Sequence, residues 1–172
     1  MTVDQVTRAL TSAVAGLQPE LRPRKVGVRA PVEVPELWAE VRREDLLPAV
    51  EALKASGPLH ISIISARDMG QEIELLYHFA VGYGTPGGEV MVTLRVAVPV
   101  SNPTVPSICA LLPGAETTER EKIEFLGITF TGIPRPDHVF LPDGFPGHPW
   151  RKDDPETAKL VNRLVEWEGK DG

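Results

Sequence analysis

The end of the chain holds the residues best suited to chemistry. His148 lies between Asp143 and Asp153, and an imidazole near a carboxylate can act as a general base, so a hydrolase centred on His148 is one hypothesis. The same stretch offers possible ligands for a divalent metal, namely His138, His148, Asp137, Asp143, Asp153 and Asp154. None of the histidines forms an HxxxH or HExxH pair, so the spacing does not favour a metal site.

Other reactive side chains are better explained by structure. Cys109 lies in the apolar stretch "SICALL", which favours a buried, inert thiol over a nucleophile. Glu119 and Glu121 could form an acid–base pair, but Thr118 to Glu121 fits a capping box, and exposed glutamates are common at a helix start. His60 and His78 fall in predicted strands. Nucleotide-binding loops and a GxSxG motif are missing from the sequence, so no catalytic constellation is indicated.

Composition narrows the class of protein. The 172 residues carry a net charge of -6, which argues against nucleic acid as the main partner. A single cysteine cannot form an intramolecular disulfide or hold an iron–sulfur cluster unaided. The sequence has no apolar run of membrane-spanning length and no signal-peptide pattern at its start, so we expect a cytoplasmic protein.

Periodicity predicts the elements that must position these residues. In chain order they are a helix at 4–17, a proline-rich connection at 17–35 with a short strand at 26–28, a strand at 36–41, a helix at 43–57, strands at 59–68, 72–83 and 89–100, a helix from Thr118 to Gly127, a short strand within 127–134, and a C-terminal helix capped by Asp154. This order predicts an α+β fold with a mainly antiparallel four-stranded sheet and helices packed on one face.

We therefore divide the chain into an α+β domain (1–132, with 1–35 as a helix and proline-rich lead-in), an extended arm (133–155) and an amphipathic helix (156–172). The apolar face of that last helix is Leu160, Val161, Leu164 and Val165. The arm is too rich in proline for a sheet interior, so side chains must anchor it, and Phe140, Leu141, Phe145 and Trp150 are available. It either docks onto another protein or packs back onto its own sheet.

Residues 118–155, "TEREKIEFLGITFTGIPRPDHVFLPDGFPGHPWRKDDP", carry a family likeness. They resemble the signature of the 30 kDa subunit family of respiratory complex I, the NADH:quinone oxidoreductase, and the likeness extends more weakly back to residue 36. The matching positions are Glu119, Arg120, Glu121, Gly127, Ile128, Phe130, Gly132, Pro134, Leu141, Pro142, Asp143, Gly147, His148, Pro149, Arg151, Lys152, Asp153 and Pro155. Ile133, in "GIP", looks more like the equivalent subunits of membrane-bound energy-converting nickel–iron hydrogenases.

The resemblance implies a non-catalytic subunit with no cofactor and no metal, at the inner face of the cell membrane through its complex. It would dock onto the large quinone-site subunit, beside other hydrophilic-arm subunits, and support electron transfer from NADH to quinone. The equivalent subunit of a hydrogenase or formate hydrogenlyase, docked on the nickel–iron subunit, is the alternative. Arg151 and Lys152 would pair with acidic groups of the partner, and Trp150 would be a packing anchor. The expected partner interface comprises Glu119, Arg120, Glu121, Pro134, Phe140, Leu141, Pro142, Phe145, His148, Pro149, Trp150, Arg151 and Lys152.

Overall fold

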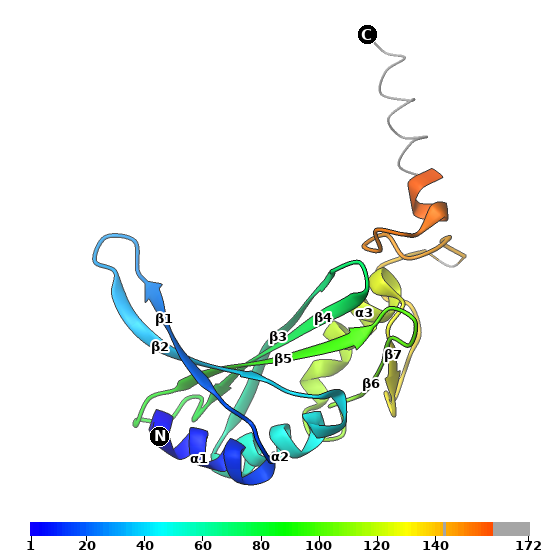
Figure 1. The fold of residues 1–172 in the computed structure, drawn as a ribbon. Coiled ribbons are helices and arrows are strands. Elements are labelled where there is room, and N and C mark those ends of the chain that lie inside the picture. The colour runs from blue at the N-terminus through cyan, green and yellow to red at the C-terminus, as the bar shows by residue number, and fades with distance from the viewer. Residues whose placement is uncertain (143, 160–172) are drawn as a thin grey trace.

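The computed structural model describes residues 1–142 and 144–159, and a five-stranded sheet lies at its centre (Figure 1). The strands are β1 (Glu20–Val26), β2 (Val32–Glu40), β3 (Leu59–Asp68), β4 (Glu72–Val81) and β5 (Val90–Pro99). Their order across the sheet is β1-β2-β5-β4-β3, and only the β2–β5 pair is parallel. The predicted α+β class with a mainly antiparallel sheet is therefore confirmed, although the predicted number of four strands is wrong.

The additional strand comes from the stretch that was expected to be a connection. Residues 17–35 contain β1 and the start of β2, which pair as an antiparallel hairpin with Pro23 directly opposite Pro35. Proline cannot donate to a strand ladder, so it usually argues against a central strand. Here the two prolines lie where no third strand pairs with the hairpin, because β5 pairs with β2 only from Glu36 to Glu40. The missing amide hydrogens of Pro23 and Pro35 therefore cost the sheet little stability.

Strand alternation divides the sheet into a core face and an open face. On β4, Ile73, Leu75, Tyr77 and Phe79 are fully buried, and the same pattern recurs on β5. These side chains form one apolar core with residues of the helices α1 (Val3–Ala13), α2 (Leu46–Ser56) and α3 (Glu116–Leu126). Two short 3₁₀ helices, η1 (Arg43–Asp45) and η2 (Pro113–Ala115), lead into α2 and α3. Figure 1 shows α1 and α2 below the sheet.

Two predicted helix ends are wrong: the first helix, expected at 4–17, ends at Ala13, and the start of α3 also differs. Thr2 caps α1 through a capping box with Gln5, and Gly127 ends α3 in the left-handed region at φ 69°. The predicted capping box from Thr118 to Glu121 is wrong, because α3 begins at Glu116 and the Thr118 hydroxyl donates to the carbonyl of Ala115. The helix begins two residues earlier than expected, because the 3₁₀ turn η2 leads directly into Glu116.

After α3, the chain forms β7 (Thr129–Thr131), which pairs in parallel with β6 (Thr104–Pro106) in a second, small sheet. The arm then returns along α3. Asp154 accepts hydrogen bonds from the amides of Glu156 and Thr157, which confirms it as the cap of the last predicted helix. The apolar face assigned to that helix lies outside the described residues. Within the part of the chain that the structure describes, no helix is long and apolar enough to cross a membrane.

Candidate functional site: the arm bound to helix α3

Glu124 holds the backbone of the arm (residues 133–155). Its carboxylate accepts hydrogen bonds from the amides of Val139, Phe140 (3.0 Å) and Leu141 (2.7 Å). Burial alone would raise the pKa of Glu124, but these three backbone donors outweigh burial and lower that pKa below its usual value. The α3 carboxylate therefore remains charged and fixes three successive residues of a segment that has no sheet partner.

Arg120 and Glu116 hold the preceding part of the arm. The Arg120 guanidinium donates to the carbonyls of Asp137 (2.8 Å) and His138 (3.1 Å). Glu116 pairs with Arg135 at 2.8 Å. Three α3 side chains spaced one turn apart thus lie on the face along which the arm runs. The four-residue spacing of Glu116, Arg120 and Glu124 is therefore explained by their contacts with the arm of the same chain.

His148 is a structural residue of this attachment. Its Nδ1 lies 2.8 Å from the carbonyl oxygen of Glu124, and its ring packs on Gly127, where an added Cβ would come within 2.7 Å. Its backbone amide donates to Asp154. Asp153 instead accepts both hydrogen bonds of Arg151. The imidazole is therefore not paired with Asp153, and the hydrolase hypothesis is not supported.

A metal site also finds no support in the geometry. Across residues 1–142 and 144–159, no group of three or more His, Cys, Asp or Glu side chains could hold an ion. Asp143 lies outside the described residues. His60 and His78 lie in β3 and β4 as predicted, where His60 stacks on Tyr83 and His78 contacts the Thr93 hydroxyl at 2.9 Å.

Arg151 binds carboxylates of its own chain, and its pairing with an acidic group of a partner stays a prediction. Its guanidinium lies 3.2 Å from the carboxylate of Asp68 at the end of β3, and the amide of Lys152 donates to the same carboxylate at 3.0 Å. Burial would raise the pKa of Asp68, but these donors, the Gly70 amide and the positive charge lower it. Because Asp68 is only 4% exposed, its charge requires such partners.

The arm leaves an aromatic patch at the surface, which we define as Phe125, Val139, Phe140 and Trp150. Trp150 stacks on Phe125 with ring centroids 4.5 Å apart, and its amide donates to the Phe125 carbonyl. Phe140 lies against the same ring at 6.1 Å. Even so, 53% of Phe140 and 43% of Trp150 remain exposed. The arm thus packs mainly on α3, reaches the sheet at Asp68 of β3 and still presents apolar surface.

The other expected interface residues occupy different environments. Glu119 has no exposed surface, so it stabilises the interior and is not placed to touch a partner. It accepts hydrogen bonds from the Ser107 hydroxyl at 2.6 Å and the Ile108 amide at 2.8 Å. Glu121 is partly buried and pairs with Lys122. The remaining expected residues lie along the arm, exposed or partly exposed: Pro134, Leu141, Pro142, Phe145, Pro149 and Lys152.

Acid should weaken the contacts that hold the arm. Glu124 and Asp154 have folded-state pKa values below their usual 4.5 and 3.8, so they stabilise the fold above these values and lose that contribution as the pH falls through the lowered ones. Burial raises the pKa of Glu119, so acidification does not weaken the core through this group. We expect the amide NMR signals of residues 139–141 to shift upfield as the pH falls below 4.5 and through the lowered pKa of Glu124. Signals that keep their positions through this range would contradict the loss of the Glu124 charge.

Cys109 should be unreactive in the folded chain. The side chain is buried, as predicted, and burial raises the pKa of its thiol to about 11. Its Sγ donates to Glu119 at 3.2 Å. We expect a disulfide reagent at pH 8 to modify the thiol only after unfolding, because the thiolate is the reactive species. Rapid modification of the folded chain would contradict the burial.

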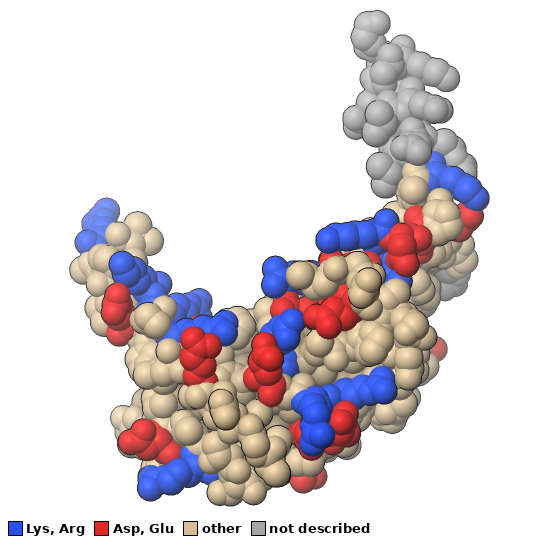
Figure 2. All heavy atoms as spheres, in the orientation of Figure 1, with Lys and Arg blue, Asp and Glu red and all other residues tan. Residues whose placement is uncertain are grey.

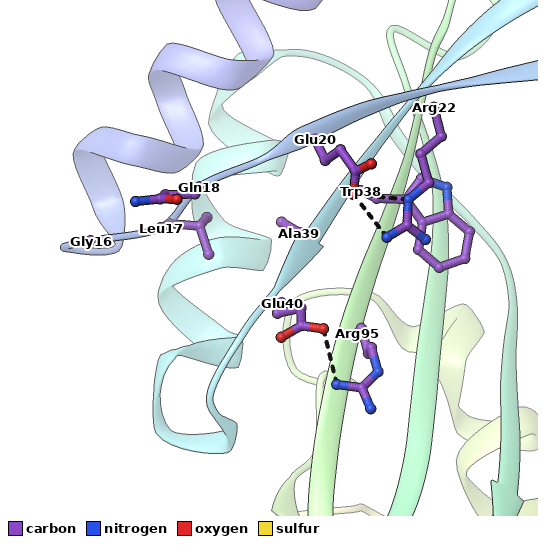
Figure 3. A pocket seen from close by; sticks show the side chains of 9 residues that line it. All are labelled: Gly16, Leu17, Gln18, Glu20, Arg22, Trp38, Ala39, Glu40 and Arg95. Carbon is purple, nitrogen blue, oxygen red and sulfur yellow. Dashed lines mark hydrogen bonds and ion pairs between the residues drawn. The ribbon is translucent and has the colours of Figure 1, made fainter.

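A hollow of about 400 Å³ lies on the open face, between the connection after α1 and strand β2 (Figure 3). Its two cations are already paired, since Arg22 binds Glu20 at 2.9 Å and Arg95 binds Glu40 at 3.1 Å. Arg95 also binds Glu74 at 2.6 Å. The hollow therefore offers no unpaired acid–base group. Sequence reasoning missed it because its walls include the stretch taken as a connection.

Comparison with known proteins identifies the class. Residues 39–159 match the family described as the respiratory-chain NADH dehydrogenase 30 kDa subunit, and this chain belongs to that family. The resemblance to the 30 kDa subunit family of complex I is thereby confirmed. The match covers the last two residues of β2, the strands β3, β4 and β5, the helices α2 and α3, and the arm, and it excludes residues 1–38, which contain β1 and most of β2.

Two relatives and one similar structure are named as parts of three different complexes. The chain is 33% identical over 127 residues to a subunit of the NADH-quinone oxidoreductase from Nocardioides sp. strain JS614, covering 70% of this chain but only 49% of that relative. It is 32% identical over 121 residues to the membrane-bound hydrogenase subunit beta of Pyrococcus furiosus, covering 69% of each. In fold it is similar to a chain of the membrane-bound sulfane sulfur reductase, an archaeal respiratory membrane complex, with a TM-score of 0.74 and 19% identity over 94% of this chain and 91% of that chain.

Proposed function

We propose that the protein is a non-catalytic subunit of a complex I-like NADH:quinone oxidoreductase, at the inner face of the cell membrane through that complex. It docks onto the large quinone-site subunit and supports electron transfer from NADH to quinone by stabilising that neighbour. Family membership supports this proposal, as does the Nocardioides relative, which is named as part of an NADH-quinone oxidoreductase.

The main support for the proposal is that the reactive side chains around the arm hold it in place, while its aromatic side chains remain exposed. The side chains that could do chemistry, Glu124, His148 and Arg151, all hold the arm in place. What remains at the surface is the aromatic patch, in which Phe140 and Trp150 are about half exposed. Exposed aromatic residues held in a fixed position are typical of the hot spots of protein–protein interfaces.

The aromatic patch is tested by Phe140→Ala in the host organism, with the tagged variant replacing the native chain. The side chain is 53% exposed and the Glu124 contact uses only its backbone amide, so the fold should persist. We expect at least a tenfold loss of co-purifying large subunit, because truncating an interface aromatic commonly costs about 2 kcal/mol or more. Tyr83→Ala is the matched control, since Tyr83 is 52% exposed and lies in the β4–β5 connection. Equal recovery with both variants would remove the patch from the interface.

The equivalent subunit of a membrane-bound hydrogenase is a second candidate. The Pyrococcus relative matches 69% of each chain, at an identity close to that of the Nocardioides relative. The same purification separates the two candidates, because the first predicts a quinone-site subunit and the second a nickel–iron subunit. Recovery of neither would contradict both.

A further inference from the structure

The β1–β2 hairpin projects beyond the sheet as a two-stranded ribbon, which we define as residues 22–35. Strand β5 pairs with β2 only from Glu36 onward, so the ribbon strands pair only with each other. Every residue of β1 is exposed. Figure 1 shows the hairpin standing away from the remaining strands. Nothing among the described residues covers it.

The ribbon exposes apolar side chains that a lone domain would normally cover. Val28 at its tip is 100% exposed, Val32 61% and Val26 38%. A two-stranded hairpin without a packed face is marginally stable in water, and bare β-branched strands invite unwanted pairing. The ribbon thus has the properties of a surface that is completed by another molecule.

Charge indicates the chemistry of that molecule. The ribbon carries Arg22, Arg24, Lys25 and Arg29 and a single acid, Glu33, in a chain of net charge -6. Arg22 is paired with Glu20 just outside the ribbon. Figure 2 shows basic side chains along the projecting hairpin. Arg24 and Arg29 have no ion pair within the described part of the chain. A concentrated positive charge on an acidic protein favours an acidic partner.

The two faces of the ribbon differ. Arg24 lies opposite Val34, and Val26 opposite Val32, so this face carries cations interleaved with valines. Lys25 lies on the other face, opposite Glu33. The first face continues onto the open side of the sheet, where the Arg22 guanidinium lies 4.4 Å above the Trp38 ring.

Shape distinguishes a protein from a lipid surface. Figure 2 shows the ribbon and the arm rising on either side of a hollowed surface. A convex protein fits such a surface, whereas a flat bilayer would touch only its raised ends.

We propose that the Arg24 face of the ribbon is a second docking surface, which binds an acidic, partly apolar surface of a neighbouring protein subunit. The inference rests on the proposed function for the existence of a parent complex, but it uses residues that the family match does not include. The valines supply the apolar contact area, and Arg24 and Arg29 meet carboxylates of the neighbour.

Zero-length cross-linking of the purified complex tests the proposal. The variant Arg24→Lys keeps the charge and places an amine on the proposed face, and a carbodiimide then joins that amine only to a carboxylate in contact. We expect mass spectrometry to find position 24 linked to an Asp or Glu of another subunit. Lys25 is an internal control, expected to link only to Glu33 of this chain. Links to another subunit from Lys25 and none from position 24 would overturn the proposed face.

Charge reversal provides an independent measurement. Arg24→Glu combined with Arg29→Glu should lower recovery of the chain in the complex at least tenfold at 150 mM salt, while Lys25→Glu should not. If the wild-type chain joins no complex, the proposed function fails. If the wild-type chain and the double variant are retained equally and position 24 gives no link, only the ribbon inference fails. Two other results would also overturn the inference, provided that position 24 gives no link to another subunit. The free chain binds phosphatidylserine vesicles and the double variant does not, or the free chain forms a dimer and the double variant does not.

Discussion

Gly127→Ala is expected to destabilise the chain and to expel His148 from its place on α3. Gly127 has φ +69°, a conformation that costs other residues roughly 1–2 kcal/mol. The added Cβ would also lie 2.7 Å from the His148 ring, and overpacking of this kind costs about 1–3 kcal/mol. We expect the free energy of unfolding, measured by urea denaturation, to fall by about 2–5 kcal/mol.

Gly132→Ala is the matched control for the clash. Gly132 has φ +84°, but an added Cβ would meet nothing within 4 Å. This variant should show the backbone cost of roughly 1–2 kcal/mol alone. Faster hydrogen exchange at the Trp150 amide, which donates to Phe125, should accompany only the Gly127 variant. Equal losses of stability would show that the His148 ring moves aside freely.

Glu124→Gln is expected to release the arm without unfolding the sheet. The substitution removes the charge that binds three successive amides and offers them only one acceptor oxygen. Hydrogen bonds to a charged group contribute about 1.5–3 kcal/mol each, and solvent can replace part of that at a surface arm. A net loss of about 2 kcal/mol corresponds to roughly thirtyfold faster exchange of the amides of residues 139–141.

An exposed glutamate on another helix provides the control. Glu51→Gln on α2 makes the same chemical change, and Glu51 is exposed. It should leave exchange of residues 139–141 within about twofold of wild type. Unchanged exchange in the Glu124 variant would mean that Arg120 and the aromatic stacking hold the arm by themselves. Loss of protection in β4 would show that the arm and the sheet open together.

Much of the fold follows from local patterns in the sequence. Alternating apolar residues from 72 to 100 predicted β4 and β5, which pair as expected, and Gly127 ends α3 as predicted. The β1 strand was missed because prolines at 23 and 35 indicated a connection. Whether a proline is tolerated depends on which strand edge lies without a neighbour, and that is a property of the assembled sheet.

The candidate site shows the same division. The sequence by itself determined the family, through the spacing of charged residues, glycines and prolines over residues 118–155, and it indicated that the arm requires anchors. Only the tertiary structure decided which side chains are anchors and which remain at the surface. Arg151 binds Asp68, 83 positions earlier in the chain, because a buried charge requires a partner that only the fold can bring near. Glu119 turns into the core, where the Ser107 hydroxyl and the Ile108 amide donate to it. Phe140 and Trp150 both pack against Phe125 of α3 on one side, and about half of each side chain remains exposed.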